Sequence, residues 1–335
     1  MWGLSNQTRY AAERTWVRDR TGHHHWVVVV KGTFEIALNG ELHLAGEQSP
    51  PLMVPEYFGE PGLSSLRFDG DLVPGKATTE VIVNACAYAP HGKPATSVPV
   101  ELTVGPVQKA LVVHGPRVYF NGGGGLAATA AQSFERCPIR YEDAYGGSDL
   151  SDPDPRKQRI DPRNPVGRGV RARAVDLVDT PAHRIEYPQG DPRKVGPAGL
   201  GVLASHWSPR LELAGTYDEA WFEHTRPLLP VDYDERFTLC APFDQRAPTF
   251  LTGGEPVRLV NMTAGGELRT TLPRVELLQT TRIKGRRQQH RSKLITVILE
   301  PEQRRLLLVW HTSLPVAATE VDHLVETIIE ERGAP

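Results

Sequence analysis

The chain has 335 residues, and its 38 Lys and Arg residues are balanced by 40 Asp and Glu residues, so the formal net charge is -2. This balance argues against a dedicated nucleic-acid-binding protein, whose affinity would depend on excess positive charge. A hydrophobic content of 39% argues against intrinsic disorder, and the 31 Gly and 29 Pro residues indicate many turns and disfavour an all-helical fold.

The cysteines and the start of the chain bear on location. Cys86, Cys137 and Cys240 are far apart and form no CxxC pair, which is typical of a reduced cytosolic protein rather than a disulfide scaffold. The first residues are polar and lack the apolar core of a signal peptide. Apolar runs such as 26–30 are far too short to span a membrane. We therefore expect a cytoplasmic protein with no membrane partner.

The first portion of the chain, residues 1–145, reads as β-strands. Residues 26–36 are rich in β-branched and aromatic side chains, and Asn39-Gly40 before 41–44 predicts a hairpin. Further strands are expected at 79–88, 98–104, 107–114 and 117–120, with Gly-Pro turns between the last three. This pattern predicts a mainly β fold, with an antiparallel sandwich or barrel in this portion.

Residues 146–206 differ in kind, because 146–201 contain 8 Pro, 8 Gly and 8 Arg with little periodicity. A segment of this length without regular structure is a functional loop system or is disordered, and its turn-forming residues favour ordered loops. The remaining portion, 207–335, returns to β-strands. It could be a second domain, or it could continue the first sheet.

Two helices are expected in the last portion. A short central helix is predicted from an N-cap at Thr216, with Asp218 and Glu219 in its first turn, to about His224. A C-terminal amphipathic helix is predicted from an apolar stripe at helical spacing, with Gly333 as its stop. The stripe consists of Val321, Leu324, Val325, Ile328 and Ile329.

Motifs for catalysis or metal binding are weak. His23 and His25 would share one face of a strand, which is half a zinc site at best, and a polar approach to a turn is the alternative. Carboxylates such as Glu142, Asp149 and Asp218 could act as a general acid and base, or they could pair with arginines. We assign no catalytic residue, no metal and no cofactor. The basic segment 281–293 reads as a solvated hairpin or as a face for an acidic partner.

A set of loops rich in Gly, Arg and aromatic residues is the most distinctive feature of the sequence. Arginine gives rigid bidentate recognition, and Trp and Tyr provide large contact areas at low entropic cost. The candidate partner-binding residues are Tyr145, Asp149, Arg163, Asn164, Arg168, Trp207, Arg210, Tyr217, Asp218 and Trp221. The alternative is that Arg163 and Arg168 tie loops together internally, through Asp149 or Asp218.

These loops also carry a family resemblance. The chain resembles bacterial accessory (adaptor) proteins of the type VI secretion system, long catalogued as a domain of unknown function. The matching stretches, within roughly residues 1–315, are 27–34, 45–48, 71–74, 141–149, 163–169, 207–210, 214–218, 253–255 and 304–310. The His23–His25 run is not part of the pattern.

The resemblance implies a non-enzymatic cytosolic adaptor that loads a toxic effector onto the secretion spike. Its expected partners are the effector and either the valine-glycine-repeat spike protein or the tip protein with proline-alanine-alanine-arginine repeats. It brings no catalytic residues to this chain. The alternatives are a permanent structural component of the phage-tail-like apparatus and a hydrolase that uses paired carboxylates.

Overall fold

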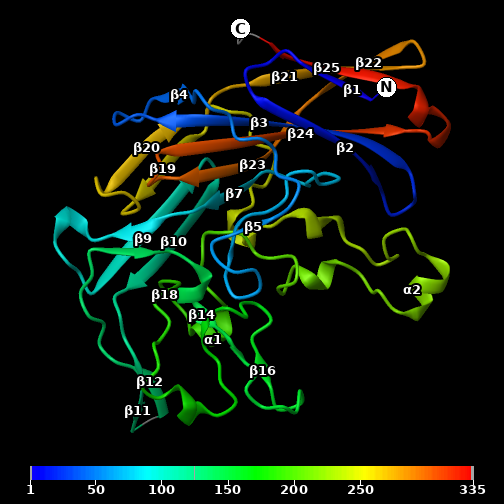
Figure 1. The fold of residues 1–335 in the computed structure, drawn as a ribbon. Helices are drawn as coiled ribbons and strands as arrows, with labels where there is room; N and C mark the ends of the chain where they lie inside the picture. The colour runs from blue at the N-terminus through cyan, green and yellow to red at the C-terminus, as the bar shows by residue number, and fades with distance from the viewer. Residues whose placement is uncertain (1, 124, 333–335) are drawn as a thin grey trace.

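The computed structural model describes residues 2–123 and 125–332, and it confirms a mainly β protein (Figure 1). A six-stranded sheet forms its centre. Its strands are β2 (Ala11–Arg18), β3 (His24–Ile36), β24 (Arg305–Val316), β23 (Lys293–Glu300) and β7 (Glu80–Val83) in spatial order, with β4 (Leu42–Leu44) beside the end of β3. No sheet among the described residues closes into a barrel, and a sandwich stays a prediction.

The run of valines explains why β3 is the central strand. Successive side chains of a strand point to opposite faces, so Val28 and Val30 enter the main core while Val27 and Val29 enter a second hydrophobic cluster. All four valines are fully buried, and each contributes on the order of 1.5–3 kcal/mol by leaving water. The predicted hairpin is confirmed, because β4 pairs antiparallel with β3 and Gly40 has a φ of 86°.

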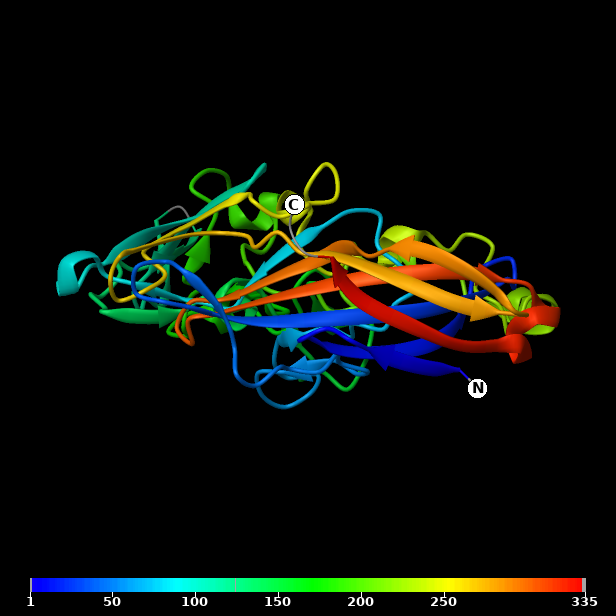
Figure 2. The ribbon, with the colours of Figure 1, turned by 90° about the horizontal axis from the view of Figure 1, so that it is seen from above.

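A four-stranded sheet lies over one face of the six-stranded sheet (Figure 2). It contains β1 (Gly3–Asn6), β25 (Leu324–Arg332), β21 (Glu276–Ile283) and β22 (Arg286–Arg291). Two buried hydrogen bonds join the sheets: the Trp26 indole donates to Thr327 at 2.8 Å, and the Thr312 hydroxyl donates to Gln279 at 2.7 Å. The basic segment 281–293 is the hairpin of β21 and β22, as the sequence predicts.

The remaining strands form a five-stranded sheet and several two-stranded pairs. The five-stranded sheet contains β18 (Ile185–Glu186), β10 (Val107–His114), β9 (Ser97–Val104), β19 (Pro256–Val260) and β20 (Glu267–Thr271). The pairs are β5 (Glu56–Tyr57) with β6 (Leu66–Phe68), β8 (Cys86–Tyr88) with β13 (Arg136–Pro138), β11 (Tyr119–Gly122) with β12 (Gly125–Ala128), β14 (Tyr145–Gly146) with β17 (Arg168–Gly169), and β15 (Ser148–Asp149) with β16 (Arg159–Ile160). The expected strand 79–88 is therefore divided between β7 and β8, which belong to different sheets.

Helices are short. The described residues contain two α-helices, α1 (Pro192–Val195) and α2 (Glu219–His224). The 3-10 turns are η1 (Pro90–Gly92), η2 (Tyr141–Asp143), η3 (Ala174–Leu177), η4 (Leu211–Leu213), η5 (Glu235–Thr238), η6 (Phe243–Gln245) and η7 (Ala318–His323). No helix in the described part of the chain has the length and apolar character needed to cross a membrane.

The predicted C-terminal helix is wrong. Residues 324–332 form β25, which pairs with β1 on one side and β21 on the other, so ladder hydrogen bonds replace those of a helix. The register shifts between Arg282, opposite Glu326, and Ile283, opposite Leu324, which leaves Val325 as the extra residue of a β-bulge. The inward positions of β25 are Leu324, Thr327 and Ile329, so Val325 and Ile328 of the predicted stripe do not lie on the buried face. Gly333 lies outside the described residues.

The six-stranded sheet combines strands from both ends of the chain, because the C-terminal strands β24 and β23 lie between the N-terminal strands β3 and β7. The divisions proposed at 145/146 and 206/207 stay predictions.

The bulge yields a test of the C-terminal strand. Ile329 is 0% exposed and Val325 is 38% exposed, whereas on a helix the two would lie on one face, four residues apart. We expect Ile329→Ala to lower the free energy of unfolding by about 3 kcal/mol, and Val325→Ala by less than about 0.5 kcal/mol, in urea titrations followed by tryptophan fluorescence. Equal losses in the two variants would contradict the strand.

Candidate functional site

The structure separates the ten predicted site residues into buried and exposed groups. Asn164, Trp207, Arg210 and Asp149 are buried. Tyr217 and Asp218 are exposed, and the other four are partly exposed. A buried side chain cannot touch a partner unless the fold opens. The buried four therefore serve the scaffold, and a partner-binding role stays a prediction for the rest.

Asn164 holds the glycine-rich loops together. Its Nδ2 donates to the carbonyl oxygens of Tyr141 at 2.8 Å and Tyr145 at 3.0 Å. A Cβ added to Gly146 would lie 2.3 Å from the Asn164 carbonyl oxygen, and one added to Gly167 would lie 2.4 Å from its Nδ2. Loops 141–149 and 163–169 thus form one unit that requires glycine for close approach.

Arg163 and Arg168 form ion pairs within the chain, as the alternative interpretation predicts, but not with Asp149 or Asp218. Arg163 pairs with Asp161 at 2.7 Å, and Arg168 pairs with Asp143 at 3.1 Å. Asp149 instead accepts hydrogen bonds from the Ala172 amide at 2.9 Å and from the Ser151 hydroxyl at 2.6 Å. These bonds, that of Ala172 first, lower the pKa of Asp149 to about 2.

Trp207 and Arg210 anchor the start of the last portion. The Trp207 ring packs edge-on against Tyr141, with centroids 5.4 Å apart. Arg210 donates to the carbonyl oxygens of Leu203 and Phe237, at 2.8 Å each, and pairs with Asp69 at 2.7 Å. Because the guanidinium is buried and fully engaged, Arg210 belongs to the scaffold.

Tyr217, Asp218 and Trp221 lie on a projecting segment, residues 214–234, which we call the α2 arm (Figure 1). Asp218 is the N-cap of α2 and accepts the Trp221 amide at 2.8 Å, so the predicted helix is confirmed but Thr216 is not its cap. Thr216 instead donates to Asp232 and so ties the two ends of the arm. The Trp221 indole donates to the Leu228 carbonyl at 2.8 Å.

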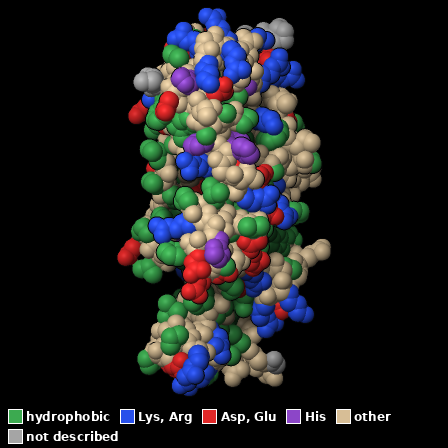
Figure 3. All heavy atoms as spheres, turned by 90° about the vertical axis from the view of Figure 1, so that its right-hand side faces the viewer, with side chains coloured by type: hydrophobic (Ala, Val, Ile, Leu, Met, Phe, Trp, Pro, Cys, Tyr) green, Lys and Arg blue, Asp and Glu red, His purple; other side chains and the backbone are tan. Residues whose placement is uncertain are grey.

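The surface of the α2 arm is both aromatic and acidic. No residue of α2 is buried, and Tyr217 and Phe222 are 53% and 58% exposed. Exposed carboxylates surround them, at Asp218, Glu219 and Glu223. Figure 3 shows acidic side chains gathering beside hydrophobic ones on this side of the molecule.

A groove of about 810 Å³ runs between the base of the α2 arm and the β2–β3 turn. His25 lines it and lies 3.1 Å from Asp19, and His23 lies 3.6 Å from the same carboxylate. His24 faces the Trp16 ring instead. Among the described residues, no group of three or more His, Cys, Asp or Glu side chains is placed to hold a metal ion.

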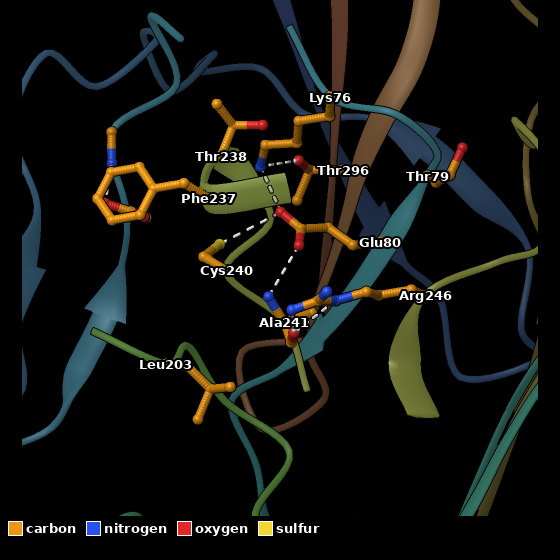
Figure 4. Close-up of polar contacts among 12 residues, drawn as sticks. Lys76, Thr79, Glu80, Leu203, Phe237, Thr238, Cys240, Ala241, Arg246 and Thr296 are labelled. Carbon is orange, nitrogen blue, oxygen red and sulfur yellow. Dashed lines mark hydrogen bonds and ion pairs between the residues drawn. The ribbon is translucent and has the colours of Figure 1, made fainter. Parts of the chain in front are cut away.

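A buried polar centre, which the sequence did not reveal, surrounds Glu80 at the start of β7 (Figure 4). The Glu80 carboxylate pairs with Lys76 and accepts hydrogen bonds from the Cys240 thiol at 3.2 Å and the Ala241 amide at 2.8 Å. Lys76 also donates to the Thr296 hydroxyl at 2.9 Å. The only sequence signal is one carboxylate in an otherwise apolar strand.

The polar centre is structural rather than catalytic. Glu80 is 0% exposed, and burial raises the pKa of Cys240 well above its ordinary value, so this cysteine stays a thiol and is a poor nucleophile. Burial disfavours a charged Glu80, but the Lys76 ammonium and the donated hydrogen bonds outweigh it and hold the pKa of Glu80 below its usual range. The charge is therefore retained inside the protein by its partners.

A second arrangement, Tyr119–His183–Glu186, has the order of a proton relay and was also missed. The Tyr119 hydroxyl lies 2.7 Å from His183 Nδ1, and His183 Nε2 lies 2.8 Å from Glu186. The backbone of Gly169 covers the hydroxyl, since a Cβ added there would lie 2.6 Å from it. The relay thus offers no open position for a substrate.

Each of the three carboxylates named in the hydrolase hypothesis accepts hydrogen bonds from its own neighbours. Glu142 accepts hydrogen bonds from the Ser65 amide and hydroxyl, at 2.9 Å and 2.6 Å, while Asp149 and Asp218 make the local bonds described above. Within the described residues, no hydrogen bond or ion pair joins any two of the three.

Comparison with known proteins gives one match. A protein-family model described as "Uncharacterized protein conserved in bacteria (DUF2169)" matches residues 21–311. The chain therefore belongs to this bacterial family. No curated protein and no solved structure matches the chain.

The polar centre predicts a large cost for removing one charge. Glu80→Gln leaves the Lys76 ammonium buried without its partner, and we expect a loss of about 3–5 kcal/mol in the free energy of unfolding. The exposed Glu47→Gln is the matched control and should change it by less than about 0.5 kcal/mol. Equal stability of the two variants in urea titrations would contradict a structural role.

The same ion pair predicts the direction of a pH effect. Because folding lowers the pKa of Glu80, its contribution to stability is fully present above its unfolded pKa of about 4.3 and is lost as the pH falls through the folded pKa. We expect the stability difference between wild type and Glu80→Gln to shrink as urea titrations are moved from pH 6 toward acid. A difference that grows toward acid would contradict this assignment.

The cysteines predict a simple chemical result. Cys86, Cys137 and Cys240 are free and buried, and burial is the largest cause that raises the pKa of Cys86 to about 12 and of Cys137 to about 11. We expect a thiol reagent at pH 8 to leave the native chain unmodified and to titrate all three thiols in denaturant. Rapid reaction of Cys240 in the native chain would show that the polar centre opens.

Proposed function

We propose that this protein is a non-enzymatic cytoplasmic adaptor of the type VI secretion system. It binds a secreted effector and delivers it to the spike or tip protein. The proposal combines the resemblance carried by the loops with one observation, namely that more than half of the Tyr217 and Phe222 side chains on the α2 arm is exposed.

Exposed aromatic rings favour a binding role for the arm. Large rings provide much contact area with few rotatable bonds, so they dominate the binding energy of protein interfaces. Phe222 lies on a capped helix, and Tyr217 precedes the cap and packs edge-on against Trp221, with ring centroids 4.7 Å apart. The Trp221 indole is fixed to Leu228, so little order remains to be gained on binding. The arm is thus preorganised for a partner.

The engagement of the carboxylates supports an adaptor over a hydrolase. Glu142, Asp149 and Asp218 each accept local hydrogen bonds that shape the fold. A general acid and base would instead face one another across a cleft, at about 5–10 Å. A permanent place in the phage-tail-like apparatus remains the second candidate, because the same arm could dock once during assembly.

The α2 arm gives the decisive experiment. A tagged chain is co-expressed with a candidate effector and the spike and tip proteins, and retention on the affinity resin is measured. We expect the double variant Tyr217→Ser, Phe222→Ser to reduce retention at least about tenfold, because such anchors contribute about 2 kcal/mol or more each. Its melting temperature should stay within about 2 °C, since both side chains are exposed.

Leu38→Ser is the matched control, because Leu38 is 86% exposed in the β3–β4 turn, away from the arm. It should retain the partners as wild type does. Failure of the wild-type chain to retain any of the three components would overturn the proposal. Recovery of the chain in purified sheath-and-spike particles would favour the structural component instead.

A further inference from the structure

A small polar pocket of about 300 Å³ lies near β8, β13 and the turn between β23 and β24, and it differs in charge from the α2 arm. Its lining includes Arg67, Arg136, Arg140, Asn84 and Phe58. None of these residues belongs to the polar centre or to the loops with the family motifs. The pocket has the size of a site for a side chain or a small ligand.

Arginines outnumber carboxylates around the pocket. Glu300, which is buried, receives two arginines: Arg67 at 2.8 Å and Arg305, whose Nε lies at 2.7 Å. Glu302 receives Arg136 at 2.7 Å and 3.0 Å, and this interaction is the largest cause that lowers its pKa to about 2. Both carboxylates therefore fix guanidinium groups in place, and positive charge remains in excess.

Arg140 supplies an uncommitted cation. It is exposed, and no carboxylate among the described residues pairs with it. Its guanidinium stacks on the Phe58 ring, 4.0 Å from the centroid. Stacking restricts the orientation of the guanidinium plane while its N–H edge stays available, and this edge matches a carboxylate in a bidentate geometry.

Asn84 adds an unsatisfied acceptor. The residue is only 9% exposed, and its Nδ2 donates to the Arg67 carbonyl at 3.0 Å. Its Oδ1 is buried and accepts no hydrogen bond from the described chain. A buried acceptor without a donor is costly, and Asn84 lines the pocket, so a small turn of its amide toward the pocket would let a ligand N–H or O–H group satisfy Oδ1.

We infer that this pocket binds an acidic residue of a partner polypeptide. The carboxylate is held by Arg140, with Arg136 also lining the pocket, and an N–H of the bound segment donates to Asn84 Oδ1 once the amide turns toward the pocket. The inference rests on the proposed function, because it names the chemistry of one partner segment. A free carboxylic acid shares the carboxylate but lacks the adjacent peptide N–H.

The test uses the purified full chain and fluorescein-labelled peptides in which glycine alternates with Glu, Gln or Lys. Fluorescence anisotropy should show the Glu peptide binding at least about tenfold more tightly than the Gln peptide, because charge-assisted hydrogen bonds are lost with the carboxylate. Arg140→Gln should weaken binding of the Glu peptide about tenfold. The exposed Arg287→Gln, on β22, is the matched control and should leave it unchanged.

Several outcomes would overturn the inference. Equal binding of the Glu and Gln peptides would show that the pocket does not recognise a carboxylate. An equal loss of affinity for the Glu peptide in Arg140→Gln and Arg287→Gln would show only a general effect of surface charge. Glutarate and N-acetylglutamate amide are compared as competitors of the labelled peptide. If both displace it at the same concentration, the pocket is a site for free acids. Melting temperatures of both variants should match wild type, since neither residue has an ion-pair partner among the described residues.

The retention assay separates this inference from the adaptor role. If Arg140→Gln loses the peptide, the pocket assignment stands whether or not the secretion components are retained. If the wild-type chain binds the Glu peptide but retains no effector, spike or tip protein, the adaptor role fails alone. If the components are retained and the peptide is not bound, the pocket assignment fails alone.

Discussion

The buried charge of Glu80 is the constraint that holds β7, β23 and the segment at Cys240 together. A carboxylate in the interior must be paired and hydrogen-bonded, or its desolvation would unfold the site. Glu80 meets this requirement only when β7, β23 and the segment at Cys240 come together, because Lys76, Thr296 and the Ala241 amide all converge there (Figure 4). A hydrophobic contact would tolerate sliding, whereas this set of directed bonds accepts one arrangement.

Hydrogen bonds from buried polar side chains also hold the loops of this protein, in place of hydrophobic contacts. Loops 141–149 and 163–169 lack the periodicity that buries one face of a strand or helix, so Asn164 organises them through hydrogen bonds to backbone carbonyls. Arg210 does this for the start of the last portion. Asn164 and Arg210 are buried in these roles, whereas Tyr217 is exposed on the surface.

Two surfaces of opposite character lie on one chain. The α2 arm is acidic and aromatic, whereas the pocket around Arg140 has an excess of guanidinium groups held by Glu300 and Glu302. Opposite charges favour different partners and suppress exchange between them. Two surfaces of opposite charge are compatible with the adaptor role proposed above, in which one chain contacts two other proteins.

Local patterns were enough to predict β3 with its hairpin and the helix at 219–224, because the residues that stabilise them are neighbours in sequence. The mainly β class and the solvated hairpin of β21 and β22 followed in the same way. Only the tertiary structure decided that 324–332 is a strand, because its ladder partners β1 and β21 come from distant parts of the chain and the apolar spacing of the segment does not encode that pairing. It also decided the roles of Glu80 and Arg140, since several of the contacts that fix them come from distant segments. Glu80 accepts the Ala241 amide, its neighbour Lys76 bonds Thr296, 220 residues from Lys76, and Arg140 stacks on Phe58. Patterns within a window of the sequence report what a segment prefers, whereas directed bonds between remote residues exist only after the chain has closed upon itself.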